Sequence, residues 1–303
     1  MKWLKRIITV VIVLTIFYFL ITNLINNWHK IPRDSLHFNL VNILISMILL
    51  FLNFLIFVEA WRKIIFTLGD SIDFANAFWI MSSSQLAKYV PGGIWFALGR
   101  IYLGKGDKLK PETIGISVII ETALTLLVGI ILFLLSLFFA SRSSILNFLF
   151  VVPIAVFFII ILHPKVLNKL LNLSMHIFKR KPIYFNIDYL RILCLSLYFF
   201  GLWIAQIIGF YFLINSIYPV HITKIFHLAG VYTLSWMSGF IVIFAPGGLG
   251  VREGMMSLLL SSFIPSPLAI AISFLSRVWI TVFEIVVFFL GVAIHKVLSK
   301  NSY

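Results

Sequence analysis

Two copies of one tripeptide interrupt strongly apolar stretches of the chain. The copies are Pro91-Gly92-Gly93 and Pro246-Gly247-Gly248. Proline removes a helical hydrogen bond and glycine adopts backbone angles that other residues avoid, so each tripeptide is expected to break a helix. Within a membrane, a broken helix is tolerated only where other protein or a wet cavity satisfies the freed backbone groups. Two such breaks in corresponding halves of a chain indicate a transport site.

Each tripeptide has a cation nearby. Lys88 ends the segment that enters the first break, and Arg252 falls in the first turn of the helix expected after the second. A helix that starts at a break directs unsatisfied N–H groups and its positive dipole end toward the break, which favours a bound anion. A cation there is unfavourable on its own, so Arg252 needs a partner, and a phosphate would supply one. Pairing within the protein, dipole compensation or contact with lipid headgroups remains open for these cations.

Glu121 is a carboxylate in the middle of an apolar helix expected over 112–139. Hydroxyl residues share its helix face at four-residue spacing. A charged group within the membrane is rare and is a functional hypothesis by default. We therefore expect Glu121 to line the site. Its partner would be one of three cations, Lys88, Arg252 or Arg277, and the alternative role is to carry a coupling proton.

The last apolar segment, 268–294, carries Arg277 and Glu284 on one polar stripe. These two residues are about two turns apart, too far for a direct pair, so each is expected to face a partner elsewhere. We favour a site-lining role for Arg277, although charged stripes inside a bundle also serve packing. Glu253 suits either a helix cap or the site. Arg100 is expected to anchor the chain at the cytoplasmic surface.

The composition is that of a polytopic membrane protein. Of 303 residues, 61% are hydrophobic and only 11% are charged, and the mean hydropathy is +1.08. A soluble domain would carry about twice that share of charged residues. The formal net charge of +14 comes from Lys and Arg in short loops between apolar runs, as in cytoplasmic loops, so a nucleic-acid partner is not indicated. The single Cys194 excludes a disulfide within one chain, and no metal site, cofactor or catalytic constellation is predicted.

Charge and hydropathy together predict an all-α fold with about six full transmembrane helices and two re-entrant helical hairpins. The helices are expected over 7–25, 38–60, 112–139, 145–162, 191–217 and 268–294, and the hairpins, each around one tripeptide, over 73–103 and 222–264. The second hairpin could instead cross the membrane fully. Both termini are expected in the cytoplasm and the protein in the cell membrane. The polar residues Asn42, Ser46 and Asn53 share one helix face, which is expected to meet protein.

The chain is interpreted as a single transmembrane domain, 1–303, that contains two repeats of opposite orientation. The first repeat is 38–139 and the second is 191–303, each with the order helix, hairpin, helix. Residues 1–37 supply an anchor helix and outer loop, and 140–190 supply a further helix and a basic cytoplasmic loop. Inverted-topology repeats of this kind are the plan of many secondary transporters.

The stretch 88–95, KYVPGGIW, with Gly99-Arg100, and the stretch 246–254, PGGLGVREG, resemble the lysylphosphatidylglycerol synthase transmembrane-region family, a flippase-like membrane family. The resemblance covers nearly the whole chain, and it implies translocation of a lipid between leaflets. In two-domain relatives a separate soluble domain transfers the amino acid. Since the chain ends at Tyr303, soon after the last helix, we expect no aminoacyltransferase domain and no synthase activity.

The leading hypothesis is translocation of an anionic lipid or lipid-linked saccharide, with its phosphate held by Lys88, Arg252 and the helix ends at the tripeptides. The expected partner is thus an anionic phospholipid or a polyprenyl-phosphate-linked substrate. One alternative is an integral-membrane polyprenyl-phosphate glycosyltransferase, although the basic loop 163–190 offers only Asp188 as a carboxylate. Another is an accessory subunit of a lipid-modifying or glycan-assembly complex. A homo-oligomer or a synthase partner is a further option.

Overall fold

The computed structural model describes residues 38–89, 95–105, 109–140, 187–242 and 245–300, with scattered positions between 18 and 25 and between 153 and 172. The secondary structure of this part is helical throughout. Four of its helices are long and apolar enough to cross a membrane. The protein is therefore an all-α polytopic membrane protein, as predicted. Apart from isolated positions, the helices expected over 7–25 and 145–162 lie outside the described residues, as do Pro91, Gly92 and Gly93.

The four long helices correspond to four of the predicted spans. They are α2 (Leu40–Thr67), α5 (Pro111–Ala140), α8 (Tyr189–Asn215) and α11 (Ser266–Lys300). The predicted end of the first of these, residue 60, is wrong, because α2 continues to Thr67. Charged residues such as Arg62 and Lys63 end the apolar run but do not interrupt helical hydrogen bonding. The helix ends just before Gly69, whose φ of +91° is typical of the glycine that follows a helix C-terminus. The extra turns keep Trp61 inside the protein, where its side chain is fully buried.

In each half of the chain, one helical hairpin lies between the two long helices, α2 and α5 in the first half and α8 and α11 in the second. The first contains α3 (Phe74–Gln85), η3 (Leu86–Tyr89) and α4 (Trp95–Gly104), and the second contains η4 (Ile222–Lys224), α9 (Ile225–Ile241), η5 (Pro246–Gly248) and α10 (Val251–Leu260). A helix needs about 20 residues to cross a bilayer, so α3, α4 and α10 are each too short to do so alone. Each hairpin therefore contains at least one arm that is too short to span the bilayer.

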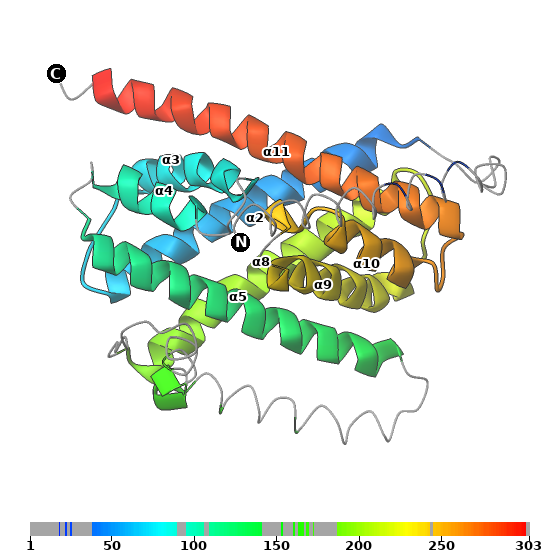
Figure 1. Ribbon diagram of the computed structural model, residues 1–303, viewed down its shortest axis with the longest axis horizontal. Helices are drawn as coiled ribbons and strands as arrows, with labels where there is room; N and C mark the ends of the chain where they lie inside the picture. The colour runs from blue at the N-terminus through cyan, green and yellow to red at the C-terminus, as the bar shows by residue number, and fades with distance from the viewer. Residues whose placement is uncertain are drawn as a thin grey trace, which may run out of the picture.

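The first half of the described chain runs from α2 to α5 and the second from α8 to α11. Each half packs one arm of its hairpin against the last long helix of the other half. The corresponding helices α2 and α8 form an extensive contact and run side by side through the middle of the bundle (Figure 1). The first arm of each hairpin packs on the last long helix of the other half, α3 on α11 and α9 on α5. The second arm packs on the long helix that follows it, α4 on α5 and α10 on α11. Each of these contacts in one half thus has a counterpart in the other.

Small residues allow close packing at the two contacts between halves, α3 with α11 and α9 with α5. A Cβ added to Gly291 on α11 would lie 2.1 Å from the hydroxyl oxygen of Ser82 on α3. A Cβ added to Gly230 on α9 would lie 2.2 Å from the hydroxyl oxygen of Ser136 on α5. Because lipid tails are as apolar as the side chains, membrane helices associate through such close packing and through hydrogen bonds. Both exchanged contacts therefore depend on a glycine opposite a serine.

The polar face of α2 packs against α8, as predicted. The side-chain amide of Asn42 donates to the carbonyl of Asn215 at 2.9 Å, and that of Asn53 donates to the carbonyl of Leu202 at 2.7 Å. Ser46, between them, is fully buried. These hydrogen bonds join the two halves along the central pair of helices.

Candidate functional site

The hinge of the second hairpin, the tripeptide Pro246–Gly248 that forms η5, lies against η3 of the first hairpin. Gly247 has φ +58°, a conformation that favours glycine, and a Cβ added there would lie 3.4 Å from the ring of Tyr89. The same Cβ would lie 2.9 Å from Nη2 of Arg277. A side chain at Gly247 would therefore collide with the guanidinium of Arg277.

Lys88, at the end of η3, forms an ion pair with Glu284 of α11. The hydroxyl of Tyr89 donates to the other oxygen of the same carboxylate at 2.9 Å and lies 3.2 Å from the hydroxyl of Thr281. Glu284 is therefore held by two neighbours from the first hairpin. This contact links the segment just before Pro91 to the middle of the longest helix.

Glu253 and Arg277 form a second pair between α10 and α11. Nε of Arg277 lies 3.7 Å from Oε1 of Glu253, while Oε2 of the same carboxylate accepts from the backbone N–H of Gly250 at 2.6 Å. Glu253 thus closes the N-terminus of α10, the capping role that its position allowed. Within the described residues, Nη2 of Arg277 is buried and has no hydrogen-bond partner.

Arg252 is the third cation of this region, and its partner is neutral. Its Nη2 donates to the hydroxyl of Tyr232 on α9 at 2.5 Å, and its guanidinium carbon lies 5.0 Å from the centre of that ring. Gln206 on α8 donates to the same hydroxyl at 2.8 Å. Only 8% of Arg252 is exposed, and within the described part of the chain no carboxylate lies within ion-pair distance of it.

These contacts define what we call the central cluster, which involves both hairpins and α11. Its members are Lys88, Tyr89, Tyr232, Arg252, Glu253, Arg277, Thr281 and Glu284. The cluster contains the predicted cations and Glu253, and it surrounds Gly247 of the second tripeptide. The separate partners predicted for Arg277 and Glu284 are confirmed, since Arg277 faces Glu253 and Glu284 faces Lys88.

Glu121 pairs with Arg100, and not with any of the three cations expected for it. Nη1 and Nη2 of Arg100 contact the two carboxylate oxygens of Glu121 at 2.5 and 3.1 Å. The prediction that Arg100 anchors the chain at the membrane surface is wrong, because only 1% of its surface is exposed. Hydropathy alone could not reveal this, since two of the three rings around the guanidinium, Phe57 and Trp61, belong to the distant helix α2. The third, Phe96, lies one turn earlier on α4 itself.

Several members of the cluster were not among the predicted site residues. There was a reason in the sequence to consider two of them: Tyr89 lies two residues before the first tripeptide, and Glu284 is a carboxylate on the polar stripe of the last helix. Tyr232, and Gln206 beside the cluster, could not be recognised from the sequence. A tyrosine or a glutamine in an apolar helix is common, and nothing in the sequence indicated that these two lie near Arg252. Within the described residues, no group of three or more His, Cys, Asp or Glu residues could hold a metal ion.

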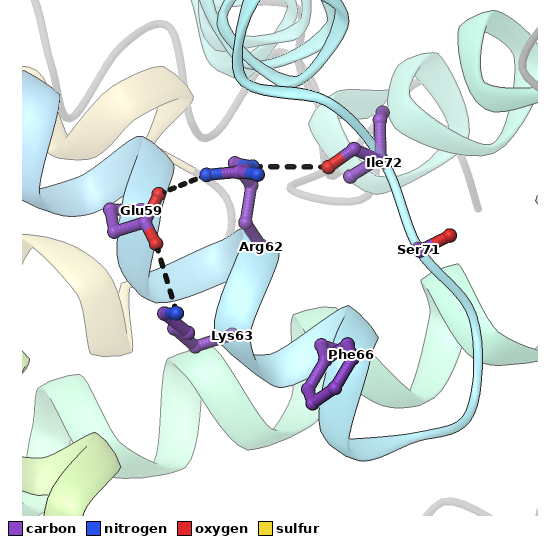
Figure 2. A pocket seen from close by; sticks show the side chains of 6 residues that line it. All are labelled: Glu59, Arg62, Lys63, Phe66, Ser71 and Ile72. Atoms are coloured by element: carbon purple, nitrogen blue, oxygen red, sulfur yellow. Dashed lines mark hydrogen bonds and ion pairs between the residues drawn. The ribbon is translucent and has the colours of Figure 1, made fainter.

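A shallow hollow lies at the end of α2 and shares no residue with the central cluster. Figure 2 shows Arg62 bridging Glu59 at 2.5 Å and the carbonyl of Ile72 at 3.0 Å, while Lys63 contacts the other oxygen of Glu59 at 3.4 Å. The cations of this hollow are thus engaged with a carboxylate and a loop carbonyl of their own segment. They tie the end of α2 to the loop that leads into the first hairpin.

A family model described as the lysylphosphatidylglycerol synthase TM region matches residues 6–288. The chain belongs to this family. Membership in the lysylphosphatidylglycerol synthase TM family indicates a lipid-related role in a membrane, which agrees with the four apolar helices of membrane length. No curated protein and no solved structure matches the chain. The details of the role must therefore be argued from the central cluster.

Proposed function

We propose that this protein moves an anionic lipid, or a lipid-linked saccharide with an anionic headgroup, between the leaflets of the cell membrane. The observation that supports this most is the environment of Arg252. Its guanidinium is buried beside the hinge of the second hairpin and is bonded to a neutral phenol. A buried cation without an anion is costly, and in membrane proteins such a residue commonly marks a substrate pathway.

The position of the cluster along the fold agrees with such a pathway. Thr281 and Glu284 lie near the middle of α11, so if α11 spans the bilayer they lie near its midplane. Transporters with inverted repeats bind substrate at this depth, where broken helices of the two repeats meet. Here Tyr89 of the first hairpin lies against Gly247 of the second. The headgroup would bind at this contact while the lipid tails stay in the bilayer.

Alternating access would arise from movement of the two halves relative to each other. The exchanged contacts of α3 with α11 and of α9 with α5 are the surfaces along which the halves would slide. We further propose that both termini lie in the cytoplasm, since this orientation places most Lys and Arg loops on that side. Labelling of single cysteines added at each end in intact cells would test the orientation.

Lipid transport by purified protein in liposomes tests the proposal directly. A fluorescent anionic phospholipid is placed in both leaflets, and a membrane-impermeant quencher reports the fraction that reaches the outer leaflet. Arg252→Gln is expected to reduce the rate at least about tenfold, because the headgroup loses a charge-assisted hydrogen bond. Arg191→Gln is the matched control, since Arg191 is exposed at the start of α8. Equal rates in the wild type and Arg252→Gln would exclude the proposed site.

A further inference from the structure

We propose that the central cluster selects a headgroup with one negative charge on a single phosphodiester, and discriminates against lipids that carry their sugar on a diphosphate. The inference rests on the proposed function and specifies its substrate class. It follows from the charges of the cluster, from the partners of each charge and from the cost of leaving a charge uncompensated in a buried site.

Two of the three cations of the cluster are already neutralised by the protein. Lys88 is hydrogen-bonded directly to Glu284, so this pair is neutral as a unit wherever its proton resides. Arg277 faces Glu253 at 3.7 Å, and this second pair is also neutral as a unit. The pair of Arg100 and Glu121 is likewise balanced and adds no net charge. None of these pairs therefore calls for an anion on grounds of charge alone.

Arg252 is the charge that remains. Its hydrogen-bond partner, the hydroxyl of Tyr232, is neutral, and Gln206, which bonds to the same hydroxyl, is neutral too. Within the described residues the cluster consequently has three cations and two carboxylates, a net charge of +1. One negative charge on a ligand brings this total to zero.

Hydrogen-bond donors in the cluster suit the two free oxygens of a phosphodiester. Nη2 of Arg277 is buried and has no partner within the described part of the chain, and it points at the hinge glycine Gly247. Arg252 also has donors beyond the one that Tyr232 accepts, because a guanidinium carries five N–H groups.

Both arginines border the second tripeptide. Arg277 adjoins Gly247, and the Cβ of Arg252 lies beside Gly239, which packs against Gly248. Guanidinium groups match phosphate oxygens in geometry, and one phosphate bound at this tripeptide would have both as donors.

A more highly charged headgroup would leave the site unbalanced. A diphosphate has two or more negative charges, so its binding would change the total from +1 to −1 or below. A buried charge without a partner is strongly unfavourable, whereas a balanced and hydrogen-bonded set is tolerated. A phosphatidylglycerol and a polyprenyl lipid with its sugar on one phosphate both meet the requirement, since each presents a phosphodiester with one charge.

Transport of three lipids under identical conditions tests the inference. Wild-type protein in phosphatidylcholine liposomes is assayed with fluorescent phosphatidylglycerol, a polyprenyl monophosphate sugar and a polyprenyl diphosphate sugar. At least one of the two phosphodiesters is expected to move at least about tenfold faster than the diphosphate. The comparison between the two phosphodiesters identifies which lipid family is the substrate. Equal rates for all three lipids would overturn the inference while leaving translocation in place.

A change in the charge of the cluster should change the selectivity in a stated direction. Glu284→Gln removes one carboxylate and raises the net charge to +2, so the ratio of diphosphate to phosphodiester transport is expected to rise about tenfold. Arg252→Lys keeps the charge and should preserve the wild-type ratio. A ratio that is unchanged in folded Glu284→Gln protein would contradict charge selection.

Binding provides a measurement that does not depend on transport. The same three lipids are titrated into purified wild-type protein and detected by native mass spectrometry, with phosphatidylcholine as the zwitterionic reference. Preferential binding of the phosphodiesters supports the inference even if Glu284→Gln fails to fold. If the phosphodiesters bind preferentially and no lipid is translocated, the proposed function fails and the headgroup selectivity stands. Equal binding of all four lipids overturns the selectivity.

Discussion

The guanidinium of Arg100 makes two parallel hydrogen bonds to the carboxylate of Glu121, at 2.5 and 3.1 Å, inside the protein. The pair joins α4 of the first hairpin to α5, the long helix that follows it. Arg277 and Glu253 join α11 to α10 in the second half. The arginine is on the hairpin in the first half and on the long helix in the second. Each hairpin is thus fixed to its following helix by an ion pair, with the charges exchanged.

Loss of Glu121 should destabilise the protein strongly. Glu121→Gln leaves the buried charge of Arg100 without its partner, and removal of one member of a buried pair costs about 3–5 kcal/mol. The free energy of unfolding in detergent measures this. Glu112→Gln is the control, because Glu112 lies on the same helix and is exposed. If Glu121→Gln is as stable as the control but no longer transports lipid, Glu121 acts in transport and not as a structural partner of Arg100.

Gly248 is expected to tolerate no side chain. It has φ +71°, and a Cβ there would lie 2.8 Å from the Cα of Gly239, so Gly248→Ala combines backbone strain with a collision against the backbone of α9. Gly69→Ala is the matched control, because Gly69 has φ +91° and its added Cβ would meet nothing within 4 Å. The control should lose about 1–2 kcal/mol of unfolding free energy from strain alone. Gly248→Ala should lose clearly more, and equal losses would show that the hinge can move away from α9.

The close contact of α3 with α11 should depend on Gly291. Gly291→Ala places a methyl group 2.1 Å from the hydroxyl oxygen of Ser82, and overpacking of this kind costs about 1–3 kcal/mol. The double variant with Ser82→Gly should recover most of this loss. Gly115→Ala serves as the control, since its Cβ would meet no atom within 4 Å, and it should be neutral or slightly stabilising. Thermal unfolding of the four proteins provides the test, and a Gly291→Ala variant with wild-type stability would show that these helices are not closely packed.

Lys88 and Glu284 should be energetically coupled across the two halves. Lys88→Met, Glu284→Gln and the double variant form a cycle whose interaction energy is expected to be about 0.5–3 kcal/mol, since the residues are in direct contact. The exposed pair of Lys63 and Glu59 gives the comparison cycle, because Lys63 is half exposed and such pairs contribute about 0–1 kcal/mol. Chemical denaturation in detergent measures both. Additive effects of the two substitutions would mean that this ion pair does not hold η3 to α11.

The sequence was sufficient to locate the long helices and the hairpins. Apolar runs of membrane length, separated by basic loops, predict spanning helices because the bilayer requires them. The tripeptide that begins at Pro246 predicts the break before α10 because proline and glycine interrupt helical hydrogen bonding. The same reasoning misplaced the end of α2, since a charged residue such as Arg62 ends an apolar run but does not end a helix.

The partners of the charged residues could not be predicted in the same way. Sequence position indicated that Glu121 and Arg277 were unusual, because charges inside apolar helices are costly. Which cation meets which carboxylate depends on contacts between segments far apart in the chain, as for Lys88 and Glu284. Arg100 shows the difficulty most clearly, because the rings of Phe57 and Trp61 that cover its guanidinium come from α2, far earlier in the chain.

The exchanged packing of the hairpins has a consequence for biosynthesis. The arm α3 is synthesised before α11, the helix against which it packs, and α5 and α8 are synthesised between the two. At about 5–20 residues per second, the first hairpin waits on the order of ten seconds or more for its neighbour. During that interval its short arms and Lys88 must be shielded from lipid by the insertion machinery or by earlier helices. A chain truncated before α11 should therefore be degraded rather than accumulate as a stable half.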